Sequence, residues 1–273
     1  MKLRDRFWLW GHPEGRYNSE YGNTQISRMT PMEACLYLGV RNTFMVPARR
    51  EVNRRQYNQS FTTLNGVAWE CYKDLNAGLE PSAVDVLIRE SADFPNINGV
   101  VYDDFIGSGV GYRNIPVENL WEVHNRLQNN GVRPLNMWMV LYTHEFDLDP
   151  SDPNLELYDE KVFADYIKPF DGIIMWTWCE KDISLIPQKF EAFKKLTEGK
   201  HRMVGCYLWN FGEQKAATGD AVKWQLDWYR EKMLSGEIEG VVLHTNTMAD
   251  LDLEAYDVAV AWMQEHGDEE LPE

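Results

Sequence analysis

Two adjacent carboxylates, Asp103 and Asp104, follow a short apolar run at residues 99–102. The β-branched and aromatic residues of this run are typical of a buried strand. Carboxylates at the point where a buried strand reaches the surface are costly to desolvate unless they are paired, hydrogen-bonded or used in a reaction. This stretch therefore indicates either acid–base chemistry or a structural role in bonding loop amides.

Strand geometry limits what the two acids can do together. Side chains alternate along a strand, so Asp103 shares a face with Val101, and Asp104 shares the opposite face with Tyr102. We therefore expect one chemical group and one positioning group, with a second carboxylate supplied by another strand. Further carboxylates stand at or just after other expected strands: Glu70, Glu145, Glu180 and Glu213.

Aromatic, imidazole and amide side chains also stand near the ends of expected strands. Indole faces can pack against pyranose rings, and imidazoles or amides can bond hydroxyl groups. The same residue types also fill cores and order neighbouring groups by hydrogen bonding, so each has a structural interpretation as well. The candidates for binding a sugar are Trp10, His12, Tyr142, His144, Trp176, Trp178, Trp209, Asn210, His244 and Asn246.

Apolar runs typical of strands alternate with amphipathic helical segments along the chain. Proline near a helix start and glycine after its end set several boundaries, as at Pro31 and Gly39. A basic loop is expected at residues 49–55. The expected strands are residues 7–10, 42–46, 67–72, 99–105, 135–142, 172–178, 202–209 and 240–244, and the expected helices are residues 31–38, 81–92, 116–128, 159–167, 187–198, 220–234 and 251–264.

Repeated strand–helix units with buried strands predict a parallel sheet with right-handed crossovers. Eight such units in 273 residues predict an α/β fold, a (β/α)8 TIM barrel that forms a single domain over residues 1–273, with an acidic, frayed tail at 268–273. An open doubly wound sheet is the alternative, but the glycines at 107, 109 and 111 lack the G-x-G-x-x-G spacing of a dinucleotide-binding turn.

The charge of the chain bears on its partners. It carries 27 Lys and Arg residues against 43 Asp and Glu residues, a formal net charge of −16. This charge repels nucleic-acid phosphates and anionic membrane surfaces, so we exclude both as partners. The 11 Trp and 13 Tyr residues fit a carbohydrate ligand, although ordinary packing accounts for most of them. The sequence leaves the oligomeric state open, a homo-oligomer included.

Four cysteines, Cys35, Cys71, Cys179 and Cys206, lie in apolar segments and form no C-x-x-C pair. We interpret them as reduced, buried thiols of a cytoplasmic protein. The first residues lack the apolar segment of a signal peptide, and no apolar run reaches membrane-span length. No phosphate-binding loop, zinc ribbon or Schiff-base motif stands out, so no cofactor and no metal are expected.

The acids at residues 103 and 104 give the chain a resemblance to glycosidase barrels that have a catalytic aspartate at the end of the fourth strand. The chain also resembles, over nearly its whole length, a set of bacterial TIM-barrel proteins. The motifs that carry this likeness are Tyr102-Asp103-Asp104-Phe105, Leu141-Tyr142-Thr143-His144, Trp176-Thr177-Trp178 and Tyr207-Leu208-Trp209-Asn210-Phe211-Gly212. The Asn-Glu pair common on the fourth strand of such barrels and the spaced acids of chitinases are both absent.

The resemblance implies that two carboxyl groups hydrolyse a glycosidic bond. Asp103 or Asp104 would be the nucleophile or general base. Glu180 or Glu213 would be the general acid, while the acids at positions 70 and 145 stay in reserve or bind substrate. The strand-end tryptophans would form sugar platforms, and the strand-end histidines and asparagines would bind hydroxyl groups.

Two other functions remain open. Glu70, one acid of the Asp pair, His144 and Glu180 come from successive strands and could hold Mn²⁺ or Mg²⁺ in a sugar isomerase or epimerase. No short ligand motif such as H-x-H accompanies them. The third function is a non-catalytic sugar-binding barrel, which would bind its ligand without turnover.

Overall fold

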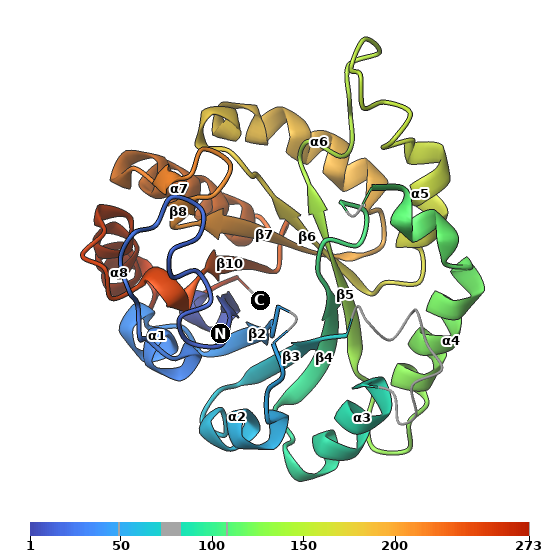
Figure 1. Cartoon of the computed structure of the whole chain (residues 1–273), viewed down its shortest axis with the longest axis horizontal. Helices are drawn as coiled ribbons and strands as arrows, with labels where there is room; N and C mark the ends of the chain where they lie inside the picture. The colour runs from blue at the N-terminus through green and yellow to red at the C-terminus, as the bar shows by residue number, and fades with distance from the viewer. Residues whose placement is uncertain (49, 72–82, 108, 273) are drawn as a thin grey trace. The chain divides into compact units, whose positions relative to one another are not determined.

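The computed structural model describes residues 1–48, 50–71, 83–107 and 109–272 (Figure 1). Eight parallel strands close into a barrel in the order β1-β10-β7-β6-β5-β4-β3-β2, and helices alternate with them along the chain. The predicted (β/α)8 TIM barrel is thereby confirmed. The barrel strands are β1 (Phe7–Gly11), β2 (Asn42–Met45), β3 (Gly66–Glu70), β4 (Ile97–Tyr102), β5 (Asn136–Tyr142), β6 (Gly172–Trp176), β7 (His201–Tyr207) and β10 (Gly240–His244).

Short-range sequence signals set both ends of α1 and the start of α7. Thr30 and Glu33 form a capping box at the start of α1, and Gly39 ends this helix in the left-handed conformation at φ 70°. The Thr218 side chain caps α7 in the same manner as Thr30, by accepting the Ala221 N–H. The helices are α1 (Pro31–Leu38), α2 (Arg54–Ser60), α3 (Ala83–Asp93), α4 (Val117–Gln128), α5 (Glu160–Ile167), α6 (Ile186–Leu196), α7 (Gly219–Leu234) and α8 (Glu254–His266).

Some elements differ from the sequence expectation. The basic residues Arg54 and Arg55 open a helix, α2, because the Asn53 side chain caps it, whereas we expected a loop. The seventh barrel strand ends at Tyr207, and the two residues after Leu208 instead form β8 (Trp209–Asn210), which pairs antiparallel with β9 (Lys215–Ala216). The end of the expected strand 67–72 and the start of the expected helix 81–92 lie outside the described residues.

The end of β4 differs in a way that matters for the acids. The strand ends at Tyr102, so Asp103 and Asp104 lie in the turn that follows it. Asp104 has φ 49°, in the left-handed region that non-glycine residues adopt at a cost in free energy. The strict alternation that we expected from strand geometry therefore does not extend to this pair.

The chain forms two compact units. The first contains Met1–Val67, Thr177–Ser184 and Met203–Glu273, and the second contains Ala68–Trp176 and Leu185–Arg202. The expectation of a single domain over residues 1–273 stays a prediction. Among the described residues, none of the helices combines the length and the apolar character that a membrane span requires.

The second unit is organised around β4, β5 and β6. Tyr102 at the end of β4 lies opposite Met139 of β5, and Tyr142 at the end of β5 lies opposite Trp176 of β6. Strand β5 therefore extends three residues beyond the end of β4. Helices α3, α4 and α5 lie outside β4 and β5 (Figure 1), and the side chains of Tyr102 and Trp176 are fully buried.

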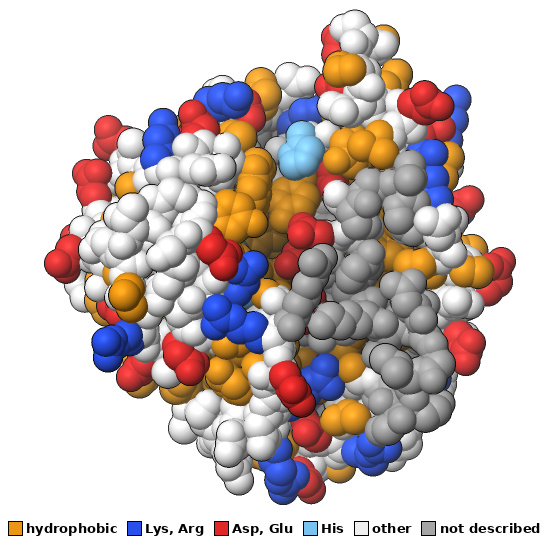
Figure 2. All heavy atoms as spheres, viewed as in Figure 1, with side chains coloured by type: hydrophobic (Ala, Val, Ile, Leu, Met, Phe, Trp, Pro, Cys, Tyr) orange, Lys and Arg blue, Asp and Glu red, His pale blue; other side chains and the backbone are white. Residues whose placement is uncertain are grey.

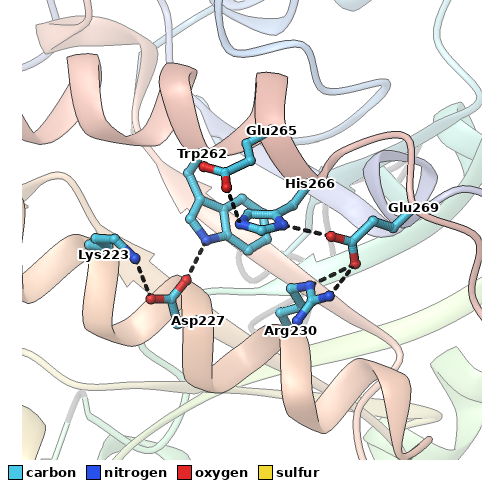
Figure 3. Close-up of polar contacts among 7 residues, drawn as sticks. All are labelled: Lys223, Asp227, Arg230, Trp262, Glu265, His266 and Glu269. Atoms are coloured by element: carbon cyan, nitrogen blue, oxygen red, sulfur yellow. Dashed lines mark hydrogen bonds and ion pairs between the residues drawn. The ribbon is translucent and has the colours of Figure 1, made fainter.

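In the first unit, polar contacts join α7 to α8 (Figure 3). The Asp227 carboxylate of α7 accepts the indole N–H of the buried Trp262 of α8 at 2.8 Å and pairs with Lys223. One turn further along α7, Arg230 binds Glu269, which also bonds His266 at the end of α8. These contacts join α7 to α8 and bind both helices to Glu269, which follows α8 in the chain.

The acidic tail, which we expect to be frayed, makes backbone hydrogen bonds up to Leu271. Leu3 N–H donates to Glu269 O at 2.8 Å, and Leu271 N–H donates to Met1 O at 2.9 Å. Asp268 adds ion pairs with Lys2 and Arg4, which lower the pKa of the Asp268 carboxyl. The two ends of the chain are therefore held side by side.

Truncation after Gly267 should lower the free energy of unfolding by about 1–3 kcal/mol, because it removes backbone hydrogen bonds together with exposed ion pairs of small individual value. Urea-induced unfolding of the truncated and full chains measures this difference. A frayed tail would instead leave the unfolding midpoint unchanged.

Candidate active site

An acidic cluster in the second unit is the strongest candidate site. It consists of Glu70 at the end of β3, Asp103 and Asp104 after β4, and Glu145 after β5. Burial raises the pKa of Asp103 well above its usual range, and the neighbouring charges of Asp104, Glu70 and Glu145 raise it further, against a smaller opposite effect of the Asp104 N–H. This raised pKa favours the protonated form, which a general acid must hold before the reaction.

Glu145 is the most buried member of the acidic cluster, with 0% of its surface exposed. Its Oε2 accepts the backbone N–H of Tyr142 at 2.8 Å, and its own N–H donates to Tyr142 O at 2.9 Å. Its Oε1 is buried and accepts no hydrogen bond from the described residues. Burial raises the pKa of Glu145 to about 8; the Tyr142 N–H opposes this rise, and the charge of Asp104 adds to it.

Asp104 is the exposed member of the acidic cluster. Its Oδ1 accepts the hydroxyl of Tyr142 at 2.9 Å. The Tyr142 ring stacks on the exposed imidazole of His144, with ring centroids 5.3 Å apart. Tyr158 also lies close, with its ring centroid 6.2 Å from that of His144. Burial and the charges of Glu145 and Asp104 raise the pKa of Tyr158. On the face drawn in Figure 2, acidic side chains and a histidine reach the surface next to hydrophobic side chains.

The buried carboxyl of Glu145 predicts a pH-dependent stability. Its pKa rises from 4.5 in the unfolded chain to about 8 in the folded protein. The folded state thus binds the proton more tightly, and this stabilisation is complete below the unfolded pKa and is lost as pH rises through the folded one. The E145Q variant cannot ionise, so between about pH 5 and about pH 9 the wild type should lose on the order of 4 kcal/mol more unfolding free energy than E145Q.

Denaturant unfolding of wild type and E145Q across this pH range measures the difference. Equal pH dependence of the two proteins would contradict a proton on buried Glu145.

The first unit contains an aromatic cluster of its own, formed by Tyr21, Trp178, Tyr207 and Phe211. The rings of Trp178 and Phe211 lie 5.9 Å apart at 30°, and Tyr21 and Tyr207 each present an edge to Trp178. Tyr21 is 37% exposed, and Trp178 and Tyr207 are half-buried. Of the four tryptophans expected as sugar platforms, Trp178 alone keeps accessible ring surface.

The other three expected platforms are buried side chains. Trp10 is 2% exposed, Trp176 is 1% exposed and Trp209 is 6% exposed. The Trp209 indole N–H donates to the backbone carbonyl of Tyr21 at 3.0 Å, so it supports the loop that carries an aromatic-cluster residue. These indoles pack the strands and the adjoining loop, as large aromatic side chains usually do.

His12, His244 and Asn246 are also buried. The Asn246 amide accepts His12 N–H at 2.8 Å and donates to His12 O at 3.0 Å and Met29 O at 2.8 Å. Burial lowers the pKa of His12 to about 3 and that of His244 well below its usual range, so both imidazoles are neutral. The ring of His12 bonds Val46 O and the Tyr17 hydroxyl. These groups hold β1, β10 and their loops in place.

The two expected general acids, Glu180 and Glu213, lie in the first unit, apart in sequence from the acidic cluster. Both oxygens of Glu180 bind Thr218 at the start of α7, one to its N–H at 2.9 Å and one to its hydroxyl at 3.0 Å. Glu213 accepts the Asn210 amide at 2.7 Å, and this bond lowers the pKa of Glu213. A lowered pKa favours the carboxylate, the opposite of what a general acid needs.

Sequence reasoning did not single out Tyr21 and Tyr158. Tyr21 and Tyr158 stand in long loops without periodicity, so nothing in the spacing marked them. Among the described residues, no group of three or more His, Cys, Asp and Glu side chains is arranged to hold a metal ion. The metal-dependent alternative gains no support from this part of the chain.

Comparison with known proteins places the fold. No protein-family model and no curated protein matches the sequence. Active domain 2 of a chitinase from Pyrococcus furiosus is 11% identical, with TM-score 0.59 over 97% of each chain. A family GH18 chitinase from Chromobacterium violaceum is 12% identical, with TM-score 0.59 over 97% of this chain and 84% of that one.

A GH5_18 protein from Streptomyces cattleya, solved in complex with Manβ1-4GlcNAc, is 12% identical, with TM-score 0.55 over 98% of this chain and 83% of that one. At these identities the likeness establishes the fold. The chain therefore has a TIM barrel of the kind found in glycoside hydrolases, and the expected resemblance to such barrels is confirmed at this level.

Proposed function

We propose that the protein is a glycoside hydrolase-like enzyme that acts on a carbohydrate through its acidic cluster. The observation that carries this proposal is the contrast between neighbouring acids after β4: Asp103 has a strongly raised pKa, while Asp104 is exposed and accepts a tyrosine hydroxyl. Glycoside hydrolysis requires one carboxyl group that donates a proton and a second that acts as a nucleophile or base. Pairs of acids with divergent environments supply this division of roles.

In this proposal, Asp103 protonates the oxygen of the leaving group, and Asp104 attacks the anomeric carbon or activates a water. The Tyr142 hydroxyl orients the Asp104 carboxylate by its 2.9 Å hydrogen bond. The exposed imidazole of His144, stacked on Tyr142, is placed to bond a sugar hydroxyl. Glu70 adds negative charge that keeps the proton on Asp103.

The ligand we propose is a neutral oligosaccharide. The aromatic cluster of the first unit offers accessible ring surface at Trp178, which suits the apolar face of a pyranose. Several proteins that share the fold are chitinases, and one is solved with Manβ1-4GlcNAc bound. Chito-oligosaccharides and Manβ1-4GlcNAc are therefore the first substrates to test.

Asp103→Asn and Asp104→Asn should each lower kcat for the hydrolysed oligosaccharide by about 100-fold or more, because each removes one acid–base role. Chromatography of the reducing-end products measures the rate. Asp165→Asn is the matched control, because Asp165 pairs with Lys168 on the exposed side of α5 and should leave the rate unchanged. Unchanged hydrolysis in both cluster variants would exclude the proposal.

Trp178→Ala should raise the dissociation constant for the same oligosaccharide about 3- to 10-fold, since it removes a ring platform. Trp224→Ala removes an exposed indole, 39% accessible, from α7 and serves as the control. Calorimetric titration measures both constants. An equal rise of the dissociation constant in both variants, or no rise in either, would show that Trp178 is not a sugar platform.

A further inference from the structure

The Glu145 side chain has a role that follows neither from the barrel fold nor from the proposed reaction of Asp103 and Asp104. The N–H groups of consecutive strand residues point to opposite sides. Thr143 N–H donates to Trp176 O of β6 at 2.8 Å, so Tyr142 N–H points to the other side, toward β4. Because β4 ends opposite Met139, no strand residue is there to accept it. The Glu145 side chain folds back and accepts this N–H at 2.8 Å.

The second oxygen of Glu145 meets the turn after β4. A Cβ built at Gly107 would lie 2.7 Å from Glu145 Oε1, so any larger residue at this position would require the Glu145 carboxyl to shift. The same turn carries Asp104 in its left-handed conformation at φ 49°. Glu145 thus contacts two parts of the chain that position Asp104. One is Tyr142, whose hydroxyl bonds the Asp104 carboxylate, and the other is the turn that contains the Asp104 backbone.

We propose that Glu145 is a positioning residue, which fixes the Tyr142 backbone and the turn at Gly107 and thereby orients the Asp104 carboxylate. With no exposed surface, it acts through Tyr142 rather than on a ligand. Its raised pKa agrees with this role, because the neutral carboxyl can stay buried beside Asp104. The inference rests on the proposed function for its catalytic consequence, while its structural content stands independently.

Two variants separate positioning from catalysis. Glu145→Gln keeps a carbonyl oxygen that can accept the Tyr142 N–H, whereas Glu145→Ala removes it. We expect E145Q to keep kcat for the oligosaccharide within about threefold of wild type, and E145A to lose about 10- to 100-fold in kcat with little change in KM, because a displacement near 1 Å at a reacting group has effects of this size. If E145A does not fold, E145D makes the same comparison, since its shorter side chain draws the carboxyl away from Tyr142.

Amide hydrogen exchange gives a readout that does not depend on activity. The Tyr142 amide should exchange at least about tenfold faster in E145A than in wild type and stay protected in E145Q. Glu160→Ala is the matched control, because Glu160 likewise accepts a backbone N–H, that of Asp147, from its place at the start of α5. The Glu160→Ala variant should exchange the Asp147 amide faster and leave the Tyr142 amide as protected as in wild type.

Two results would overturn the proposal. One is loss of hydrolysis in E145Q comparable to that of D104N with the Tyr142 amide still protected, which would make Glu145 itself catalytic. The other is unchanged protection of Tyr142 in E145A. If the wild type hydrolyses no oligosaccharide, the proposed function fails alone, and the exchange experiment still decides whether Glu145 fixes Tyr142.

Discussion

The need to satisfy backbone hydrogen bonds where barrel strands end governs both halves of this structure. A buried N–H or C=O without a partner costs free energy comparable to a lost hydrogen bond. Glu145 meets this need on β5, where the strand extends beyond β4. Asn246 meets it beside β1, where its amide bonds both the N–H and the C=O of His12. Side chains with oxygen or amide groups thus continue the hydrogen bonding of the sheet into its loops.

The electrostatic surroundings of the acids then determine which of them favour the protonated form and which favour the carboxylate. A protein with a formal charge of −16 gathers several carboxyl groups at the ends of β3, β4 and β5. Burial and the neighbouring negative charges raise the pKa values of Asp103 and Glu145, which favours the protonated form of both. The acids of the first unit have different surroundings. Glu180 and Glu213 are bound by N–H, hydroxyl and amide donors, which suit a carboxylate.

The barrel could be predicted from the sequence because strand and helix periods, helix caps and glycine stops all agreed along the chain. The Asp pair was also visible, as two acids after an apolar run. What the sequence could not give was the direction of individual side chains beyond the strands: the left-handed turn at Asp104 and the reversal of Glu145 onto its own strand. Residue type likewise could not separate the buried Trp10 and Trp176 from the accessible Trp178, since packing alone makes that distinction.

The position of β1 in the barrel has a consequence for synthesis on the ribosome. Strand β1 lies between β2 and β10, and β10 follows all the other barrel strands in sequence. One edge of β1 therefore stays unpaired until β10 has been synthesised, while β4, β5 and β6 can pair as soon as they emerge. During this interval β1 presents an open strand edge to other chains, which makes it a segment that benefits from chaperone protection.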